Sequence, residues 1–215
     1  ALGEVIYEKM LNAILQGRIS AGEKLNEMQL SEQFNVSRTP IREALLRLER
    51  EGFISHTKHV GSVVNKISDK EIGETYELIA LLEGQAARNA VKTIRDEELA
   101  KLWDLHEAMR EAVKKRELFR YVKLNSEFHD YIAARAGNQK LWTIVKNLRG
   151  LIYRSVAAGQ TLPLYVSHYL DQHEKIIQAM ADRNAGRAAK LMSSHLQSAH
   201  KNLLKVRRDQ EQVTP

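Results

Sequence analysis

The sequence predicts a mainly α-helical protein, in which an N-terminal winged helix-turn-helix is followed by an all-α antiparallel bundle of six helices. Three observations predict this fold class. Apolar residues recur at helical spacing over most of the 215 residues, whereas the period of strands occurs only between residues 53 and 67. After that stretch, short breaks divide the chain into further helices. We expect a winged domain at 1–67, a helical domain at 68–208 and a tail at 209–215.

The winged domain begins with two predicted helices. The first spans 4–17, ends at a glycine and has an apolar face formed by Val5, Ile6, Met10 and Ile14. The second runs from about Asn26, whose side chain can cap a helix, to Phe34. Asn35 and Val36 then leave room only for a tight connection to the next helix.

A third helix and two short strands complete the winged domain. Ser37 or Thr39 caps the helix, and Pro40 is acceptable because it lies in the first turn. The helix ends at Gly52, and its buried stripe is formed by Ile41, Ala44, Leu45 and Leu48. Residues 53–57 and 62–67 then have the period of strands, which predicts a two-stranded wing around a turn at 58–61.

The rest of the chain shows only helical patterns. Polar or glycine-containing breaks such as "GN" at 137–138 and "NAG" at 184–186 separate the predicted helices. These helices are expected at 69–91, 95–115, 117–136, 139–158, 163–182 and 185–208. Their short connections favour an antiparallel bundle.

Composition limits the classes of protein to which the chain can belong. Its hydrophobic content of 43% is enough for a buried core, and no apolar run is long enough to cross a membrane. With no cysteine, the chain has no disulfide, thiolate nucleophile or cysteine-ligated zinc. We therefore expect a cytoplasmic protein without a membrane partner. The net charge of +6 favours an acidic partner, although it also fits solubility alone.

Arginines gather at the start of the third predicted helix. Arg38 and Arg42 lie one turn apart on a face that avoids the apolar stripe, and Arg47 follows them. In a helix-turn-helix this end meets base edges in the major groove, where arginine can bind guanine with two hydrogen bonds. The hydroxyls of Ser37 and Thr39 could contact phosphates. The alternative interpretation is an ordinary solvated face of a charged helix.

The turn of the wing carries a second set of candidate DNA contacts. Lys58, His59 and Gly61 could follow the DNA backbone or enter the neighbouring minor groove. Gly61 would permit a close approach because it has no side chain. Together with the third helix, these residues predict a double-stranded DNA partner.

Histidines on three of the later helices predict a metal site. Asn125 and His129 are four residues apart and share a helix face, and His173 and His195 lie on the last two predicted helices. If these helices adjoin, three imidazoles and an amide oxygen converge, which suits zinc or nickel with open positions. The alternative is that these histidines are core residues with satisfied hydrogen bonds.

Arg149 and Tyr153 are candidate effector-binding residues. They lie one turn apart and could direct a cation and a hydroxyl at the carboxylate of a small molecule. Alternatively, Arg149 lies on the surface and Tyr153 in the core. Neutral histidine and amide ligands leave the charge of a divalent metal uncompensated, which makes a small carboxylate the expected effector class.

Three classes of function remain open from the residues. They are a ligand-responsive transcription regulator, a His-rich metal-dependent hydrolase and a helical interaction protein. Against the hydrolase, Glu127 and Glu174 point away from the face that carries the metal ligands, which leaves no general base. An interaction protein would need neither the arginine-headed helix nor the wing.

The segment "GEKLNEMQLSEQFNVSRTPIREALLRLEREGFI", residues 22–54, resembles the DNA-binding domain of the GntR family of bacterial transcription regulators. The remainder resembles the all-helical FCD effector domain of the FadR subfamily, and six helices suggest its VanR-like branch. The resemblance implies operator contacts at Arg38, Thr39, Arg42 and Gly61. The wing departs from the frequent family pattern P-G-R-G, because this chain reads "KHVG" at 58–61.

The resemblance also bears on the metal and on the effector. Metal-binding FCD domains carry a D-x-x-x-H pair and two later histidines, and the three histidine positions match His129, His173 and His195. Asn125 replaces the aspartate, which implies weaker metal binding and stronger attraction of anions. Some relatives carry an arginine where this chain has Ile79, so their effectors cannot be assumed here. We expect a homodimer that reads an inverted-repeat operator.

Overall fold

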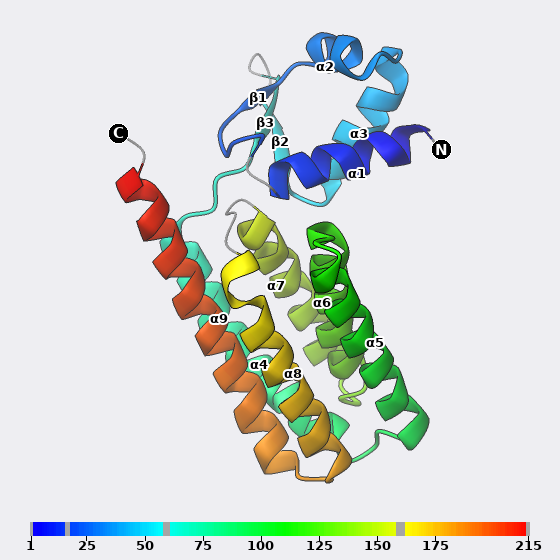
Figure 1. Ribbon diagram of the computed structural model, residues 1–215, viewed down its shortest axis with the longest axis vertical. Helices are drawn as coiled ribbons and strands as arrows, with labels where there is room; N and C mark the ends of the chain where they lie inside the picture. Colours follow the sequence, from blue (N-terminus) through cyan, green and yellow to red (C-terminus); the bar gives the residue numbers. More distant parts are fainter. Residues whose placement is uncertain (1, 16–17, 58–60, 158–161, 214–215) are drawn as a thin grey trace. The chain divides into compact units, whose positions relative to one another are not determined.

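The structure is a computed structural model that describes residues 2–15, 18–57, 61–157 and 162–213 (Figure 1). The chain separates into two compact units. One unit contains Ala1–Ser68 and Arg154–Gln160, and the other contains Asp69–Tyr153 together with Thr161–Pro215. Each unit has its own core and is described separately below.

The first unit is a winged helix-turn-helix. Its helices are α1 (Leu2–Leu15), α2 (Glu27–Phe34) and α3 (Arg38–Arg50), and its strands are β1 (Lys24–Leu25), β2 (Ile54–Thr57) and β3 (Gly61–Val64). The strands pair antiparallel in the order β1-β3-β2. The wing therefore contains a third strand beyond the two that were predicted, because a strand of two residues is too short to show a period.

The core of this unit lies between α1 and α3. The predicted stripe of α3 is buried in full, at Ile41, Ala44, Leu45 and Leu48. On α1 the buried residues are Ile6, Tyr7, Met10, Leu11 and Ile14. The prediction that Val5 belongs to this face is wrong, because 47% of Val5 is exposed and Tyr7 and Leu11 occupy the buried face instead.

Local interactions fix the connection between α2 and α3. Asn26 caps α2 as predicted, since its side-chain oxygen accepts hydrogen bonds from the backbone N–H groups of Met28 and Gln29. Asn35 has a positive φ of 52°, which ends α2 within one residue. Ser37 is the N-cap residue of α3, although its side chain makes no capping hydrogen bond.

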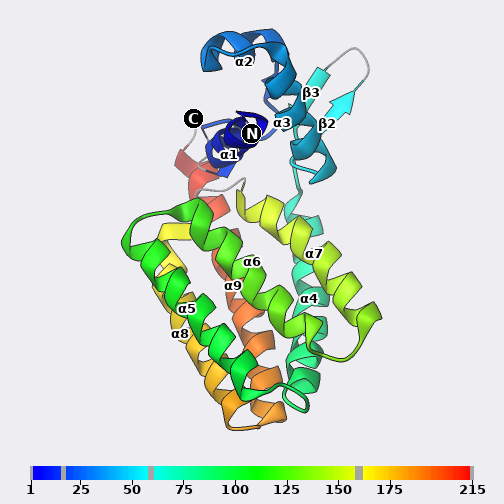
Figure 2. The same ribbon diagram turned by 90° about the vertical axis from the view of Figure 1, so that its right-hand side faces the viewer.

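The second unit is an antiparallel helix bundle (Figure 2). Its described residues form six helices: α4 (Asp69–Ala90), α5 (Asp96–Lys114), α6 (Leu118–Ala134), α7 (Gln139–Ala157), α8 (Leu162–Ala181) and α9 (Ala185–Val213). The predicted helices match them within a few residues at most ends. Helix α9 is the exception, because it continues to Val213 through most of the segment that was predicted to be a tail.

Helices α4 and α9 pack side by side along the bundle, and α8 lies against α9 and α5. At Gly84 the two backbones approach closely, so that a Cβ atom there would lie 3.2 Å from the Ala189 carbonyl oxygen. Ser193 Oγ donates to the Ala80 carbonyl oxygen at 2.7 Å across the same contact. This approach holds α4 against the helix that carries His195.

None of the helices in the described ranges combines the length and the apolar character that a membrane span requires.

Candidate nucleic-acid interface and candidate metal centre

The first turns of α3 present polar side chains away from the core. Ser37, Arg38, Thr39 and Arg42 are all exposed, whereas Ile41 and Leu45 of the same helix are buried. Helical periodicity produces this division, since the apolar stripe faces α1 and leaves the arginines on another side. The structure therefore places these four predicted DNA-contacting residues together on one accessible end of the helix.

Arg42 forms an ion pair that the sequence does not predict. Its Nε donates to Glu27 Oε2 at 2.7 Å, and Glu27 is the first residue of α2. The Arg42 side chain is 61% exposed, so this ion pair contributes little to stability. It does hold the guanidinium at the junction of α2 and α3. Arg38 forms no ion pair with any residue in the described ranges.

Arg47 does not fit the predicted role in DNA contact. It lies nine residues after Arg38, which is about two and a half helical turns and therefore the opposite side of α3. Its guanidinium stacks 3.7 Å from the centre of the Tyr7 ring, donates to Glu51 at 3.0 Å and also binds Glu4. Desolvation lowers the pKa of Arg47, but the bonds to both carboxylates outweigh it and raise the pKa. Arg47 joins α3 to α1.

The wing tip is described only in part. Lys58 and His59, two of its predicted DNA contacts, lie outside the described residues. Gly61 begins β3 with a φ of +87°, a conformation that favours glycine, and a Cβ atom there would meet nothing within 4 Å. The third predicted wing contact thus has the open space that a close approach requires.

The three predicted histidine ligands converge inside the bundle. His129 comes from α6, His173 from α8 and His195 from α9, and at most 4% of any of these residues is exposed. Each offers one ring nitrogen, and the three atoms lie within 4.8 Å of one another. A cluster with this geometry could hold a metal ion.

His129 is oriented by Glu83, a buried carboxylate on α4. Its Nδ1 lies 2.6 Å from Glu83 Oε2, and its Nε2 is buried without a hydrogen-bond partner. Because a carboxylate accepts, His129 carries its proton on Nδ1 and presents a bare Nε2. Burial, and secondarily Arg149, lowers the pKa of His129 to about 4, which keeps the ring neutral.

The other two histidines face each other. His195 Nδ1 lies 2.8 Å from the side-chain oxygen of Gln172, and the Nε2 atoms of His173 and His195 are 3.1 Å apart. Since the amide oxygen accepts from His195 Nδ1, His195 Nε2 is bare and His173 Nε2 is the donor between them. His173 Nδ1 then remains buried without a partner. Buried imidazole nitrogens without hydrogen-bond partners fit a set of metal ligands.

Glu83 also holds Arg149, which lies on α7. Arg149 Nη2 donates to Glu83 Oε2 at 2.8 Å, and its Nε donates to Oε1. Desolvation raises the pKa of Glu83, but Arg149 and then His129 outweigh it and lower that pKa to about 2. The predicted effector residue Arg149 is therefore 6% exposed and engaged in a buried ion pair, which corrects the alternative that placed it on the surface.

Asn125 is the predicted ligand that the structure does not connect to the cluster. It is half-buried on α6, one turn before His129, and its side chain makes no hydrogen bond within the described ranges. Its place on the face of His129 is compatible with a ligand role, which stays a prediction.

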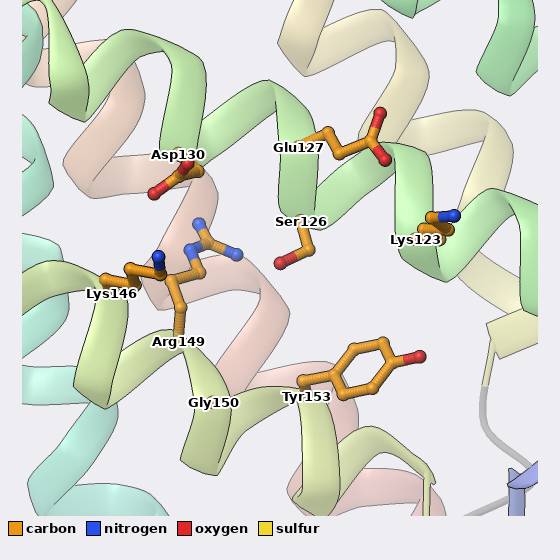
Figure 3. A pocket seen from close by; sticks show the side chains of 8 residues that line it. All are labelled: Lys123, Ser126, Glu127, Asp130, Lys146, Arg149, Gly150 and Tyr153. Carbon is orange, nitrogen blue, oxygen red and sulfur yellow. The ribbon is translucent and has the colours of Figure 1, made fainter. Parts of the chain in front are cut away.

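A pocket of about 310 Å³ opens between α6 and α7 (Figure 3). Arg149 and Tyr153 both line it, so the two predicted effector residues share one cavity. Its other lining residues are Lys123, Ser126, Glu127, Asp130, Lys146 and Gly150. Lys146 and Arg149 come from α7, whereas the carboxylates of Glu127 and Asp130 come from α6.

Two protein families match this chain in succession. The profile described as "Bacterial regulatory proteins, gntR family" matches residues 2–64, and the profile described as "FCD domain" matches residues 74–198. This chain belongs to the GntR family and carries an FCD domain. The resemblance of residues 22–54 and of the helical domain is thus confirmed.

Individual relatives of this GntR-family protein are transcription regulators. The "Nta operon transcriptional regulator" of Aminobacter aminovorans is 32% identical over 187 residues, which are 86% of each chain. The "HTH-type transcriptional repressor RspR" of Escherichia coli strain K12 is 27% identical over 210 residues, 97% of this chain and 91% of that protein. The solved structure of E. coli McbR/YncC has the same fold, with a TM-score of 0.72, 20% identity and coverage of 95% and 98%.

The chain is thus a transcription regulator of the GntR family and not an enzyme. The hydrolase alternative also lacks support in the site. Glu127 and Glu174 are exposed, which agrees with the prediction that they point away from the metal ligands, and Glu174 Oε2 lies 3.7 Å from Arg110 Nη2. Glu83 is the carboxylate beside the histidines, but with a pKa lowered to about 2 it is a poor general base near neutral pH.

Proposed function

We propose that this GntR-family regulator binds an inverted-repeat operator in the cytoplasm as a homodimer, and that a small molecule in its metal-containing FCD domain switches the binding. The observation that carries the proposal is the exposed pair Arg38 and Arg42 at the start of α3, in a helix-turn-helix whose family binds DNA. A mobility-shift assay with genomic fragments tests it. Binding without preference for any fragment would contradict an operator.

Two copies are proposed because one winged unit makes few base contacts. A single α3 reads one short half-site, and selective affinity usually requires two half-sites that are related by the symmetry of a dimer. Sedimentation of the free and the operator-bound protein measures the number of chains directly. One chain on a full operator would exclude this arrangement.

We propose that His129, His173 and His195 bind one divalent metal, zinc or nickel, with Asn125 as a fourth ligand. Support comes from the bare and buried Nε2 of His129 and from the hydrogen bonds that orient His129 and His195. Three neutral imidazoles suit both metals. A bound metal would supply positive charge and open coordination positions.

Purified protein is expected to retain about one zinc or nickel ion per chain, and His173→Ala is expected to lose it, because the metal loses one of its three histidine ligands. Elemental analysis and titration with a competing chelator measure both the retained metal and its loss.

Asn125→Asp should tighten metal binding because a carboxylate is a better ligand than an amide. The matched control is Asn147→Asp, an exposed position on α7. Equal metal affinity in both aspartate variants would exclude Asn125 as a ligand.

We propose a small carboxylate as the effector, bound with Arg149 and Tyr153. Glu83 and Arg149 cancel each other's charge, so a divalent metal on neutral imidazoles would leave the site positive. The guanidinium of Arg149 also has more N–H groups than its two bonds to Glu83 use. Together with Lys146, it gives the α7 wall of the pocket a cationic character.

A panel of small carboxylates, each paired with its neutral amide, is expected to distinguish this effector class. The acids should raise the melting temperature of the metal-loaded protein more than the amides, because only the acids are anions. Tyr153→Phe should weaken the binding of the tightest-binding acid by about 1 kcal/mol, which is the net contribution of one hydrogen bond. Amides that stabilise as well as their acids would contradict a carboxylate effector.

A further inference from the structure

A row of three polar side chains connects the protein surface with the histidine cluster. His168 is exposed on α8, and Gln172 lies one turn later on the same helix. Gln172 Nε2 lies 3.0 Å from His168 Nε2, and Gln172 Oε1 lies 2.8 Å from His195 Nδ1. Gln172 therefore joins an exposed histidine to a buried one through the two ends of a single amide.

The chemistry of the amide fixes the role of each histidine. The NH₂ end can only donate, so His168 Nε2 is the acceptor, and the oxygen can only accept, so His195 Nδ1 is the donor. With its proton on Nδ1, His195 has a bare Nε2 directed at His173, 3.1 Å away. A histidine binds a metal through a bare nitrogen, and the bond made by its other nitrogen decides which one is bare.

We propose that Gln172, turned by His168, is a positioning residue that keeps His195 in the tautomer able to bind metal. The inference rests on the proposed metal site. The metal affinity of that site then depends in part on His168, an exposed side chain five residues before His173.

His129 provides the contrast within the same cluster. Its Nδ1 proton is held by Glu83, and both oxygens of a carboxylate accept, so rotation of Glu83 cannot reverse the tautomer of His129. An amide has unlike ends, and a half-turn of the Gln172 amide would exchange donor and acceptor. His195 would then carry its proton on Nε2 and lose its lone pair toward the metal. His168 is the residue that decides between these two orientations.

The test replaces the acceptor at position 168 while leaving the buried residues unchanged. A lysine can only donate, so in His168→Lys the Gln172 oxygen should turn outward and its NH₂ group should face His195. Zinc affinity, measured by chelator competition, is expected to fall roughly tenfold or more, as for other residues that orient metal ligands. In His168→Gln an acceptor remains, and zinc affinity should stay close to that of the unchanged protein.

Two further variants separate orientation from charge. Ser167→Lys adds the same charge at the neighbouring exposed position, which forms no hydrogen bond with Gln172 in the described part of the chain, and should leave zinc affinity nearly unchanged. Gln172→Glu accepts from His195 in either orientation, so combining it with His168→Lys should restore the binding. If His168→Lys binds zinc as tightly as Ser167→Lys, or if the double variant is not restored, the proposal is wrong.

Ring-nitrogen NMR of the metal-free protein provides the second readout. His195 should be protonated on Nδ1 in the unchanged protein and on Nε2 in His168→Lys. The same tautomer in both would overturn the proposal whatever the affinities. Should the unchanged protein bind no zinc at all, the proposed metal site fails, while this NMR comparison still decides whether Gln172 sets the tautomer.

Discussion

Replacing Arg38 and Arg42 together by alanine is expected to abolish selective operator binding. Both side chains are exposed at the start of α3, where a helix-turn-helix meets base edges. Arginine that binds guanine with two hydrogen bonds contributes about 1–3 kcal/mol of discrimination, so two independent contacts account for about 2–6 kcal/mol per half-site. Phosphate contacts remain in the variant, which should therefore bind all sequences weakly and alike.

Fluorescence anisotropy with the operator and with scrambled DNA, over a range of salt concentrations, measures this loss. Arg50→Ala is the matched control, because Arg50 is an exposed arginine at the far end of the same helix. It should keep the preference for the operator. A double variant with unchanged operator preference would show that α3 does not read the DNA.

Arg47→Ala is expected to lower stability and to leave sequence preference on DNA unchanged, unlike the double variant at Arg38 and Arg42. Arg47 binds Glu4 and Glu51 and stacks on Tyr7, so its loss should lower the melting temperature of the winged unit. Sequence preference on DNA should be retained in the fraction that is folded. Charge alone does not tell on which side of a helix a partner lies, so the sequence predicts the same role for Arg47 as for Arg38 and Arg42.

Much of the fold could be predicted because it depends on local patterns. The stripe from Ile41 to Leu48, the cap at Asn26 and the breaks between the bundle helices are all encoded by neighbouring residues. The strand β1 was missed because its two residues owe their conformation to pairing with β3. The end of α9 was placed too early because the charged residues beyond 208 carry little apolar period.

Part of the candidate site could likewise be predicted from the sequence, and part could not. The three histidines were predicted from spacing and from the family resemblance, and the structure brings them together. Glu83 and Gln172 were not predicted as partners, because their bonds to His129 and His195 join residues 46 and 23 positions apart. One signal was present: Glu83 interrupts the otherwise apolar and small-residue face of α4. A carboxylate on a buried face requires a partner, which here is Arg149.

That buried pair leads to the prediction with the largest effect on stability. Arg149→Met should lower the free energy of unfolding by about 3–5 kcal/mol, because it leaves the carboxylate of Glu83 buried without its cation. Chemical denaturation of the chelator-treated protein measures this without a contribution from bound metal. The control Arg110→Met removes an exposed arginine that lies 3.6 Å from Glu107, and it should cost less than about 1 kcal/mol.

The double variant Arg149→Met with Glu83→Gln decides whether lost charge compensation or lost side-chain volume lowers the free energy of unfolding. Without a carboxylate to neutralise, the missing arginine should matter less, so the double variant should be more stable than Arg149→Met alone. It should still bind zinc more weakly than the unchanged protein, because a glutamine accepts the Nδ1 proton of His129 less strongly than Glu83 does. If the two substitutions instead destabilise additively, the Glu83–Arg149 pair contributes packing rather than electrostatic compensation.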